Sequence, residues 1–329
     1  MSNINVSKLV LIDGNAIVHR AFHALPPLNN KNGQVTNAVY GFFAMVLKVV
    51  NDLRPEHLIV CFDKAAPTFR KVLYVGYQSQ RPKMVDELSS QFVALHEVLE
   101  KAGIKIFEVD GYEADDLIGT ISKQSREDVI ILSGDRDLLQ LVNGRVRVLA
   151  PIVGVTKMIL FDEEKVEEKY GLKTHQLADY KALVGDASDN YPGVTGIGPK
   201  TASTLIREYD TLENLYKHLV DLSPKISEKL ATDAEQAVLA KKLATIEVAA
   251  PIKYVANEAK VSSIDEKSLL ESFRNLGFES LITRFNLEKV QELSKIEEKN
   301  PPSSKPSTNA KAKADRSKDK EDVDQMSLI

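Results

Sequence analysis

The sequence predicts an α/β fold with a parallel-rich central sheet and flanking helices, followed by a mostly α-helical region. Short, continuously apolar runs rich in β-branched residues recur between residues 8 and 135, and such runs are typical of strands covered on both faces. Helical patterns separate these runs, as they do in parallel sheets. After about residue 172 the strand patterns stop, while helical patterns continue to about residue 290.

The expected strands share one feature, which is an acidic residue where each of them ends. In chain order they cover residues 8–13, 57–63, 104–110 and 128–135, and the two longest helical patterns cover 36–53 and 84–102. The carboxyl ends of parallel strands meet at one edge of a sheet, where open α/β sheets bind their ligands. We therefore expect a single acidic cleft formed by Asp13, Asp63, Glu113, Asp115, Asp116, Asp135 and Asp137.

The composition is that of an ordinary soluble protein. The chain has 329 residues, 43% of them hydrophobic, and a net charge of -4. Its single cysteine, Cys61, excludes an internal disulfide and a cysteine-based zinc site, and fits a reducing compartment. The sequence shows neither a signal-peptide pattern nor an apolar run of roughly 18 residues. We therefore expect a cytoplasmic protein, with a disordered tail over residues 291–329, where Pro, Ser, Lys and Asp dominate.

The acidic cleft predicts a site for divalent cations. Crowded carboxylates repel one another unless they are protonated, paired with bases or bound to cations. Oxygen ligands without histidine or cysteine suit Mg²⁺ or Mn²⁺, and two such ions can promote hydrolysis of a phosphodiester. The alternative is that each aspartate merely caps a helix. The segment GDASDN (185–190) adds Asp186 and Asp189, for which the alternative is an Asx turn before Pro192.

A glycine-rich turn, GVTGIGPKTA (193–202), predicts a hairpin between two helices. It is not a P-loop, because Pro199 stands where that motif needs glycine before Lys200. Gly196 and Gly198 let the backbone approach phosphates, and free N–H groups at the start of the next helix can bind phosphate without reading bases. The alternative is an ordinary connection between helices. The candidate DNA contacts in this turn are Gly196, Gly198, Lys200 and Thr201.

A third segment, residues 62–84, interleaves basic and aromatic residues. This combination suits a nucleic-acid single strand, which it would bind by charge and by stacking. A solvated loop with a few packed aromatic residues is the alternative. The residues concerned are Lys64, Arg70, Lys71, Arg81 and Lys83, with Phe69, Tyr74 and Tyr77 between them.

Taken together, these motifs resemble the 5′-nuclease, or flap endonuclease-like, domain at the N-terminus of bacterial DNA polymerase I. The resemblance runs from about residue 8 to about residue 285. It rests on motifs that occur in the order of that family: LIDGNAIVHRAFHALPPL, TNAVYGF, FDKAAPTFR, GYEADDLIGT, LSGDRDLLQLV and LVGDASDNYPGVTGIGPKTA.

The resemblance implies a PIN-like nuclease core over residues 1–172, with a helical arch at about 64–84, and a helix–hairpin–helix region over 173–290. It also implies a 5′-3′ exonuclease and structure-specific 5′-flap endonuclease that hydrolyses DNA with two Mg²⁺ or Mn²⁺ ions, in primer removal, replication and repair. Expected substrates are 5′ flaps, nicks and single-strand/duplex junctions, with an RNA primer in an RNA–DNA hybrid as a further candidate. The family's duplex-binding hairpin often holds K⁺.

Carried over by motif, the resemblance assigns a role to each site residue. The first metal would be surrounded by Asp13, Asp63, Glu113, Asp115 and Asp116, and the second by Asp135, Asp137, Asp186 and Asp189. The catalytic set would be Asp13, Asp63, Asp115, Asp116, Arg70 and Arg81. DNA contacts outside the hairpin would be Arg20, Lys64, Arg70, Lys71, Tyr77, Arg81 and Lys83.

The sequence departs from the family in two places. Gln78 follows Tyr77 where the family usually has lysine, so one cation of the arch is missing. No polymerase sequence follows the nuclease region, so we expect a stand-alone, monomeric nuclease. The last residues, QMSLI, resemble the bacterial sliding-clamp-binding peptide, although chance similarity is the alternative. Clamp contacts would come from Gln325, Met326, Leu328 and Ile329.

Two other functions fit parts of the sequence. A PIN-like ribonuclease would share the acidic sheet edge, but it would not need the hairpin GIGPKTA. A non-catalytic DNA-binding scaffold would use the hairpin and the tail. It would gain nothing from so many carboxylates beside phosphates, because these charges repel one another.

Overall fold

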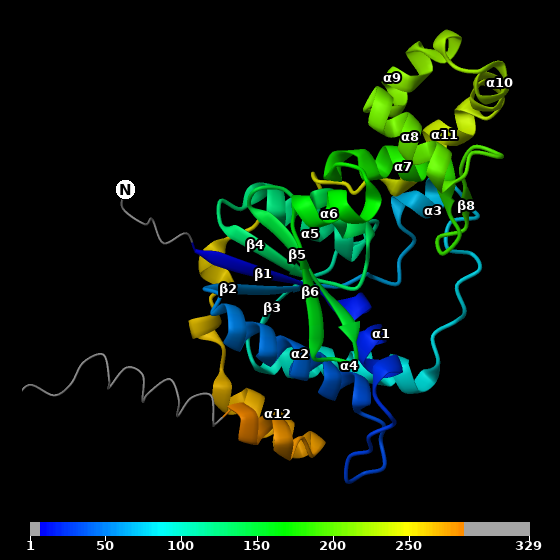
Figure 1. The fold of residues 1–329 in the computed structure, drawn as a ribbon. Helices are drawn as coiled ribbons and strands as arrows, with labels where there is room; N and C mark the ends of the chain where they lie inside the picture. Colours follow the sequence, from blue (N-terminus) through cyan, green and yellow to red (C-terminus); the bar gives the residue numbers. More distant parts are fainter. Residues whose placement is uncertain (1–6, 286–329) are drawn as a thin grey trace, which may run out of the picture. The chain divides into compact units, whose positions relative to one another are not determined.

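The computed structural model describes residues 7–285, which are built around a six-stranded sheet (Figure 1). The strand order is β3-β2-β1-β4-β5-β6. Neighbouring strands are parallel except β6, which runs antiparallel to β5. The predicted parallel-rich sheet is therefore confirmed. The strands are β1 (Lys8–Asp13), β2 (His57–Cys61), β3 (Lys105–Phe107), β4 (Asp128–Leu132), β5 (Val146–Val153) and β6 (Lys157–Phe161).

The strand register aligns the ends that carry the acidic residues. Asp13, the last residue of β1, lies beside Cys61 at the end of β2, and Ile12 lies beside Leu132 at the end of β4. Asp63 and Asp135 follow these strands within a few residues. The sequence-predicted edge is therefore present, with the carboxyl ends of three neighbouring strands side by side.

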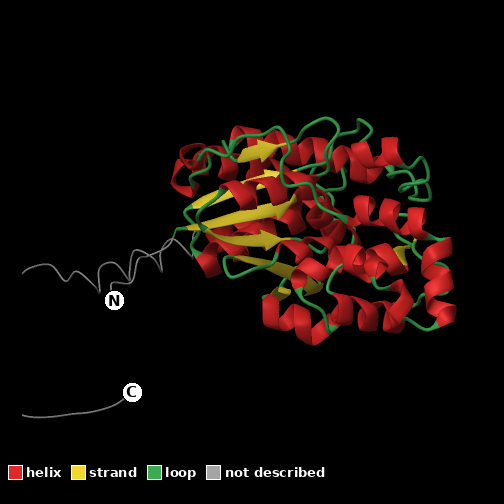
Figure 2. Cartoon of the chain, turned by 90° about the horizontal axis from the view of Figure 1, so that it is seen from above, coloured by secondary structure: helices red, strands yellow, loops and turns green. Residues whose placement is uncertain are grey.

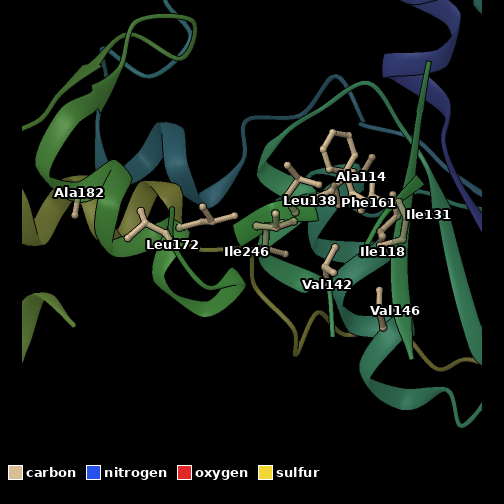
Figure 3. Close-up of a cluster of buried hydrophobic side chains, with 14 of the residues drawn as sticks. Ala114, Ile118, Ile131, Leu138, Val142, Val146, Phe161, Leu172, Ala182 and Ile246 are labelled. Carbon is tan, nitrogen blue, oxygen red and sulfur yellow. The ribbon is translucent and has the colours of Figure 1, made fainter. Parts of the chain in front are cut away.

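Each face of the sheet has its own hydrophobic core, because side chains alternate along a strand. Leu9 and Leu11 face one core, which includes helix α5 (Ala114–Gln124). Figure 3 shows part of this core, with Ile118 of α5 near Ile131 of β4. Val10 and Ile12 face the other core. Helices therefore lie on both sides of the sheet, as Figure 2 shows from above.

The second core is formed by helices from both ends of the described chain. Two of them, α2 and α4, lie where the sequence predicts helices. The last one, α12, comes back from the far end of the sequence, and its Phe273 packs against Phe43 of α2 with ring centroids 5.0 Å apart. The helices of this layer are α1 (Gly14–Ala24), α2 (Asn37–Leu53), α4 (Asp86–Lys101) and α12 (Glu266–Leu276).

The predicted change to a helical second half is also confirmed. A two-stranded hairpin interrupts the helices, with β7 (Gly185–Asp186) pairing antiparallel to β8 (Tyr191–Pro192). The domain boundaries expected from the sequence remain a prediction. The helices are α6 (Glu163–Tyr170), α7 (Leu177–Val184), α8 (Pro199–Tyr209), α9 (Leu212–Lys217), α10 (Pro224–Thr232) and α11 (Ala234–Ala244). Short 3-10 helices cover Asp137–Leu141, Thr174–Gln176, Leu219–Asp221, Ala256–Glu258 and Val261–Ser263.

The segment 64–84, expected as a helical arch, is helical only in α3 (Phe69–Leu73). Turns and extended backbone make up the rest. Gln78 adopts a left-handed φ of 53°, and proline restricts the backbone at Pro67 and Pro82. The expected arch remains a prediction, and in this structure most of the segment is not helical. No helix within residues 7–285 has the length and apolar character needed to cross a membrane.

Candidate active site

Asp13 is held in place by the start of α1 and by the end of β4. Its Oδ1 accepts a hydrogen bond from the backbone N–H of Ala16 at 3.0 Å, and its Oδ2 accepts one from the Ser133 hydroxyl at 2.7 Å. Burial, with a smaller contribution from the charges of Asp135 and Asp63, raises the pKa of Asp13 to about 7, although the hydrogen bonds from Ser133 and Ala16 oppose this rise. These three carboxylates are therefore neighbours, as the strand ends predict.

Hydrogen bonds join the loop after β2 to the N-terminus of α5. Asp63 Oδ1 accepts a hydrogen bond from the backbone N–H of Ala114 at 2.7 Å, and the Thr68 hydroxyl donates to Glu113 Oε1 at 3.0 Å. Carboxylates are favoured here because a helix N-terminus presents free N–H groups and partial positive charge. We call Asp13, Asp63, Glu113, Asp115 and Asp116 the first acidic group.

Asp116, a member of this group, forms a fully buried ion pair with Arg70 of α3. The Arg70 guanidinium donates to both carboxylate oxygens of Asp116, at 2.8 and 2.7 Å. Asp116 also accepts hydrogen bonds from the backbone N–H groups of Glu113 and Glu247. Arg70 is 1% exposed and Asp116 is 0% exposed. In this conformation neither the predicted DNA contact Arg70 nor the predicted metal ligand Asp116 faces solvent.

Asp115 is different, because one of its oxygens has no hydrogen-bond partner in the part of the chain that the structure describes. Its Oδ1 is buried and makes no hydrogen bond within residues 7–285, and the nearest Arg70 nitrogen lies 4.0 Å away. Burial raises the pKa of Asp115 well above its usual range. Native proteins rarely leave a buried carboxylate oxygen unpaired, because doing so costs stability. Such an oxygen fits a ligand of a divalent cation.

The loop after β4 and the β7–β8 hairpin bring further carboxylates together. Asp137, Asp186 and Asp189 each place an oxygen within 4.8 Å of the others. Asp135 lies beside them and accepts a hydrogen bond from the backbone N–H of Asp137 at 2.8 Å. The predicted fold-back of GDASDN toward the sheet edge is therefore present. We call Asp135, Asp137, Asp186 and Asp189 the second acidic group.

Lys181 of α7 contacts the second acidic group and was not among the predicted residues. Its ammonium donates to Asp137 and, at 2.6 Å, to Asp186. Burial alone would lower the pKa of this lysine, but the charge of Asp137 and the hydrogen bonds to Asp137 and Asp186 together outweigh burial, so the net pKa is raised. The Lys181 ammonium thus binds two of the carboxylates that a divalent cation would use. The sequence signal was weak, because Lys181 is one of many lysines on helices.

A cavity of about 470 Å³ opens beside these residues. It is lined by both charged and aromatic side chains, among them Arg81, Asp135, Tyr180, Lys181, Asp186 and Asp189. Within the described chain, the second acidic group therefore borders a space large enough for part of a substrate.

The segment 62–84 connects the two acidic groups through Tyr77 and Arg81. The Tyr77 hydroxyl donates to Glu113 at 3.1 Å and to Asp189 at 3.3 Å, and the Arg81 guanidinium donates to Asp189 at 2.6 Å. Tyr77 is 4% exposed, so it cannot stack on a base in this conformation. Arg81 keeps 52% of its side chain exposed. The other predicted bases of this segment are exposed, namely Lys64, Lys71 and Lys83.

Arg20, a predicted DNA contact, forms hydrogen bonds within the protein. Its guanidinium donates to the backbone carbonyl of Ile152 near the end of β5, at 2.7 Å, and to that of Gly154 in the turn that follows, at 3.2 Å. This contact spans more than 130 residues of sequence, so no local pattern could reveal it. Arg20 thus holds the end of β5, where Ile152 and Val153 are exposed, and the turn that follows it.

The glycine-rich turn forms the predicted hairpin before α8. Gly196 has a left-handed φ of +72°, and Gly198 with φ −91° precedes Pro199 at the first position of α8. Lys229 of α10 donates to the Gly196 carbonyl at 2.8 Å, a contact that the sequence did not suggest. Of the other predicted contacts here, Lys200 is exposed and Thr201 is half-buried.

The two glycines of the hairpin should respond differently to alanine. Gly196→Ala is expected to cost about 1–2 kcal/mol of unfolding free energy because of its left-handed φ, whereas Gly198→Ala should cost little. Both variants should weaken duplex DNA binding if both backbones approach phosphates. Urea denaturation and a DNA titration measure the two effects separately. Equal stability losses would contradict the conformational argument, and unchanged DNA affinity in Gly198→Ala would contradict a phosphate contact there.

Cation binding should be linked to proton release. Burial raises the pKa of Asp13 to about 7 and that of Asp137 to about 6, so both carry protons part of the time near neutral pH. Cations bind the ionised form, so Mg²⁺ affinity should rise from pH 6 to 7, by up to about tenfold per proton released. In the metal-free protein the same raised pKa values make stability fall as the pH rises from about 4 to 7. Calorimetry in two buffers of different ionisation enthalpy checks the release, and equal heats would contradict it.

The candidate clamp contacts Gln325, Met326, Leu328 and Ile329, and the expected disordered tail, lie outside the described residues.

Comparison with known proteins places this architecture in a family. The model "5′-3′ exonuclease, N-terminal resolvase-like domain" matches residues 8–171, and "5′-3′ exonuclease, C-terminal SAM fold" matches residues 172–267. DNA polymerase I of Bacillus subtilis (strain 168) is 41% identical over 281 residues, which cover 84% of this chain and 32% of that protein. DNA polymerase I of Caldicellulosiruptor bescii is 40% identical over 297 residues, covering 89% and 35%. The chain thus spans about a third of the length of these relatives.

Solved structures share the fold at low sequence identity. A structure of T5 5′-exonuclease with bound divalent metal ions (zinc) has a TM-score of 0.61 at 21% identity, covering 82% of this chain and 98% of that chain. The catalytic core of Rad2 in complex with DNA substrate has a TM-score of 0.55 at 16% identity, covering 82% and 88%. With both family models matched in order along residues 8–267, the chain belongs to the 5′-3′ exonuclease family.

Proposed function

We propose that this chain is a divalent-cation-dependent 5′-3′ exonuclease and structure-specific 5′-flap endonuclease acting on DNA. The observation that carries the proposal is the meeting of two acidic groups at one sheet edge. Among the described residues, Asp115 contributes a buried oxygen without a hydrogen bond, and one oxygen from each of Asp137, Asp186 and Asp189 lies within 4.8 Å of the other two. The metal ions in the T5 5′-exonuclease structure and the DNA in the Rad2 complex support this assignment.

The residues present fit two divalent cations, for which we propose Mg²⁺ or Mn²⁺. In the first group Asp13, Asp63 and Asp115 are the ligands we propose, because Asp116 is enclosed with Arg70. In the second group the proposed ligands are Asp137, Asp186 and Asp189, with Asp135 beside them. When bound, the ions supply an activated water and stabilise charge on the phosphate in the transition state. Their binding requires Lys181 to leave the oxygens it contacts.

The remaining residues bind and orient the DNA. The exposed lysines Lys64, Lys71 and Lys83 supply positive charge for the single strand, and Arg81 lies against Asp189 close to the acidic groups. The N-terminus of α8, with Lys200 and Thr201 following Gly198 and Pro199, is the proposed phosphate contact of the duplex. K⁺ is a further proposed cofactor at this hairpin, and its binding to the Gly196 carbonyl would require Lys229 to move.

We further propose that the protein acts as a monomer on 5′ flaps, nicks and RNA primers, in replication and repair at the bacterial nucleoid. Delivery to these sites through the sliding clamp is the proposed role of Gln325, Met326, Leu328 and Ile329. A tethered peptide raises the local concentration of its carrier at the target. If removal of residues 325–329 leaves the affinity for a bacterial clamp unchanged, the clamp proposal is wrong.

The test of the nuclease proposal is cleavage of a labelled duplex with a 5′ flap by the full chain. A matched duplex with a 3′ flap and an RNA single strand serve as controls. We expect release of the 5′ flap in Mg²⁺ or Mn²⁺, none in EDTA, and little cleavage of either control. Preferred cleavage of the RNA strand would favour a PIN-like ribonuclease. DNA binding without cleavage in either metal would favour a DNA-binding scaffold.

A further inference from the structure

Tyr191 places an unpaired hydroxyl next to the second acidic group. The residue is in β8, directly opposite Asp186 of β7. It is 3% exposed, and its hydroxyl has no hydrogen-bond partner among residues 7–285. An unpaired buried hydroxyl costs stability, and in native proteins it calls for a specific explanation.

The ring of Tyr191 is fixed, so its hydroxyl cannot turn toward solvent. It stacks on Tyr77, with ring centroids 6.4 Å apart and an interplanar angle of 21°. It also packs in a small apolar cluster with Ala240, Leu243 and Ala244 of α11. Any partner for the hydroxyl must therefore come from within the site.

The charges that face this hydroxyl belong to the second acidic group and its lysine. Burial raises the pKa of Tyr191, and Lys181 is the charged group that acts on it most strongly, ahead of Asp137, Asp186 and Asp189. The geometry agrees, because Lys181 is bound at 2.6 Å to Asp186, the residue opposite Tyr191 in the β7–β8 hairpin. In this structure its ammonium is bound instead to Asp137 and Asp186.

A divalent cation at these carboxylates would leave Lys181 without its two acceptors. A buried ammonium that loses its acceptors is costly, and the new positive charge would repel it. A tyrosine oxygen can accept a hydrogen bond as well as donate one. Tyr191 offers such an acceptor, already buried, already oriented by Tyr77 and not used by any described residue.

We propose that the Tyr191 hydroxyl oxygen accepts the Lys181 ammonium when a divalent cation takes Asp137 and Asp186, and that Tyr191 thereby sets the cation affinity of the second acidic group. Tyr191 is then a positioning residue that acts through Lys181. The proposal rests on the proposed function, because it needs a cation at the second acidic group. It goes beyond that function by naming the group that makes room for the cation.

The test compares Tyr191→Phe with Tyr180→Phe in the full chain. Both changes remove one phenolic hydroxyl, but Tyr180 is half-buried and lines the cavity together with Lys181. Mn²⁺ binding without DNA is measured by calorimetry, and the thermal midpoint is measured in EDTA and in Mn²⁺. We expect Tyr191→Phe to weaken one class of Mn²⁺ site about tenfold, as the loss of a supporting group at a metal site typically does. Tyr180→Phe should leave the Mn²⁺ affinity of both classes of site unchanged.

The thermal midpoints distinguish this role from a structural one. Because the hydroxyl has no hydrogen-bond partner among the described residues, Tyr191→Phe should leave the midpoint in EDTA unchanged or raise it, and should reduce only the rise caused by Mn²⁺. In a Lys181→Met background the same change should have no further effect on Mn²⁺ affinity. A lower midpoint in EDTA, failure to fold, or unchanged Mn²⁺ affinity would each overturn the proposal.

The same titration separates this proposal from the proposed function. If the wild-type chain binds no Mn²⁺ and does not cleave a 5′ flap, the proposed function fails and the role of Tyr191 fails with it. If the wild-type chain binds Mn²⁺ and cleaves, but Tyr191→Phe behaves like Tyr180→Phe, only the role of Tyr191 is wrong.

Discussion

Asp137→Asn is expected to lower the rate of 5′-flap cleavage about a thousandfold while DNA binding stays close to that of the wild type. A bound cation supplies several kcal/mol of charge stabilisation in the transition state, and each 1.4 kcal/mol is a factor of ten. Asn keeps the shape of the side chain but removes the charge that a cation needs. The measurement is single-turnover cleavage at saturating enzyme, together with a DNA titration in Ca²⁺.

A matched control for this variant is Asp110→Asn. Asp110 lies 3.4 Å from Lys64, has 73% of its side chain exposed and belongs to neither acidic group. Its rate should remain within a few-fold of the wild type. Equal rates for Asp137→Asn and the wild type would contradict a catalytic cation at the second acidic group.

Arg70→Met is expected to lower the free energy of unfolding by about 3–5 kcal/mol, since it leaves the Asp116 charge buried without its partner. Arg70 also donates to the backbone carbonyls of Leu243 and Thr245, so its loss loosens the end of α11. The measurement is urea denaturation of the metal-free protein. Lys71→Met, which changes the exposed neighbour of Arg70 in α3, should alter stability by no more than about 0.5 kcal/mol.

The double variant Arg70→Met/Asp116→Asn completes this test. It removes both charges, so its stability loss should be clearly smaller than the sum of the two single losses. If Arg70→Met kept full stability and lost only DNA affinity, Arg70 would be the DNA contact that the sequence predicted. For the same reason Asp116→Ala is a poor probe of the metal site, because it breaks this pair as well.

The parts of the fold that could be predicted from the sequence were those with local patterns. Continuous apolar runs predicted β1, β2, β3 and β4, and the aspartates after three of them predicted one acidic edge. The glycine spacing predicted the hairpin before α8. Each of these features depends on backbone geometry or alternation within a few residues, so a short window of sequence contains the information.

The missed features depend on contacts between distant parts of the chain. Arg70 and Tyr77 look like DNA contacts in their own segment. Their partners, Glu113, Asp116, Asp189 and Leu243, lie 36 to 173 residues away in sequence. The sequence around Arg70 and Tyr77 does not show that these side chains are buried, because the groups that cover them come from distant parts of the chain.

Lys181 was missed for a similar reason. A single lysine on an amphipathic helix is usually solvated, and nothing near it in sequence shows that Asp137 will fold against it. The strand β6 and the turn held by Arg20 were missed because PIVGVTKMILF combines turn residues with a weak alternation. Pairing between β5 and β6 decides that segment, not its own propensity.

The measurement that tests the central claim most directly is anomalous diffraction from crystals of the full chain grown with Mn²⁺. We predict two Mn²⁺ peaks, one beside Asp13, Asp63 and Asp115 and one between Asp137 and Asp186, with Lys181 displaced from both of its carboxylates. The absence of any Mn²⁺ peak at saturating metal, with Lys181 still bound to Asp137 and Asp186, would contradict the account.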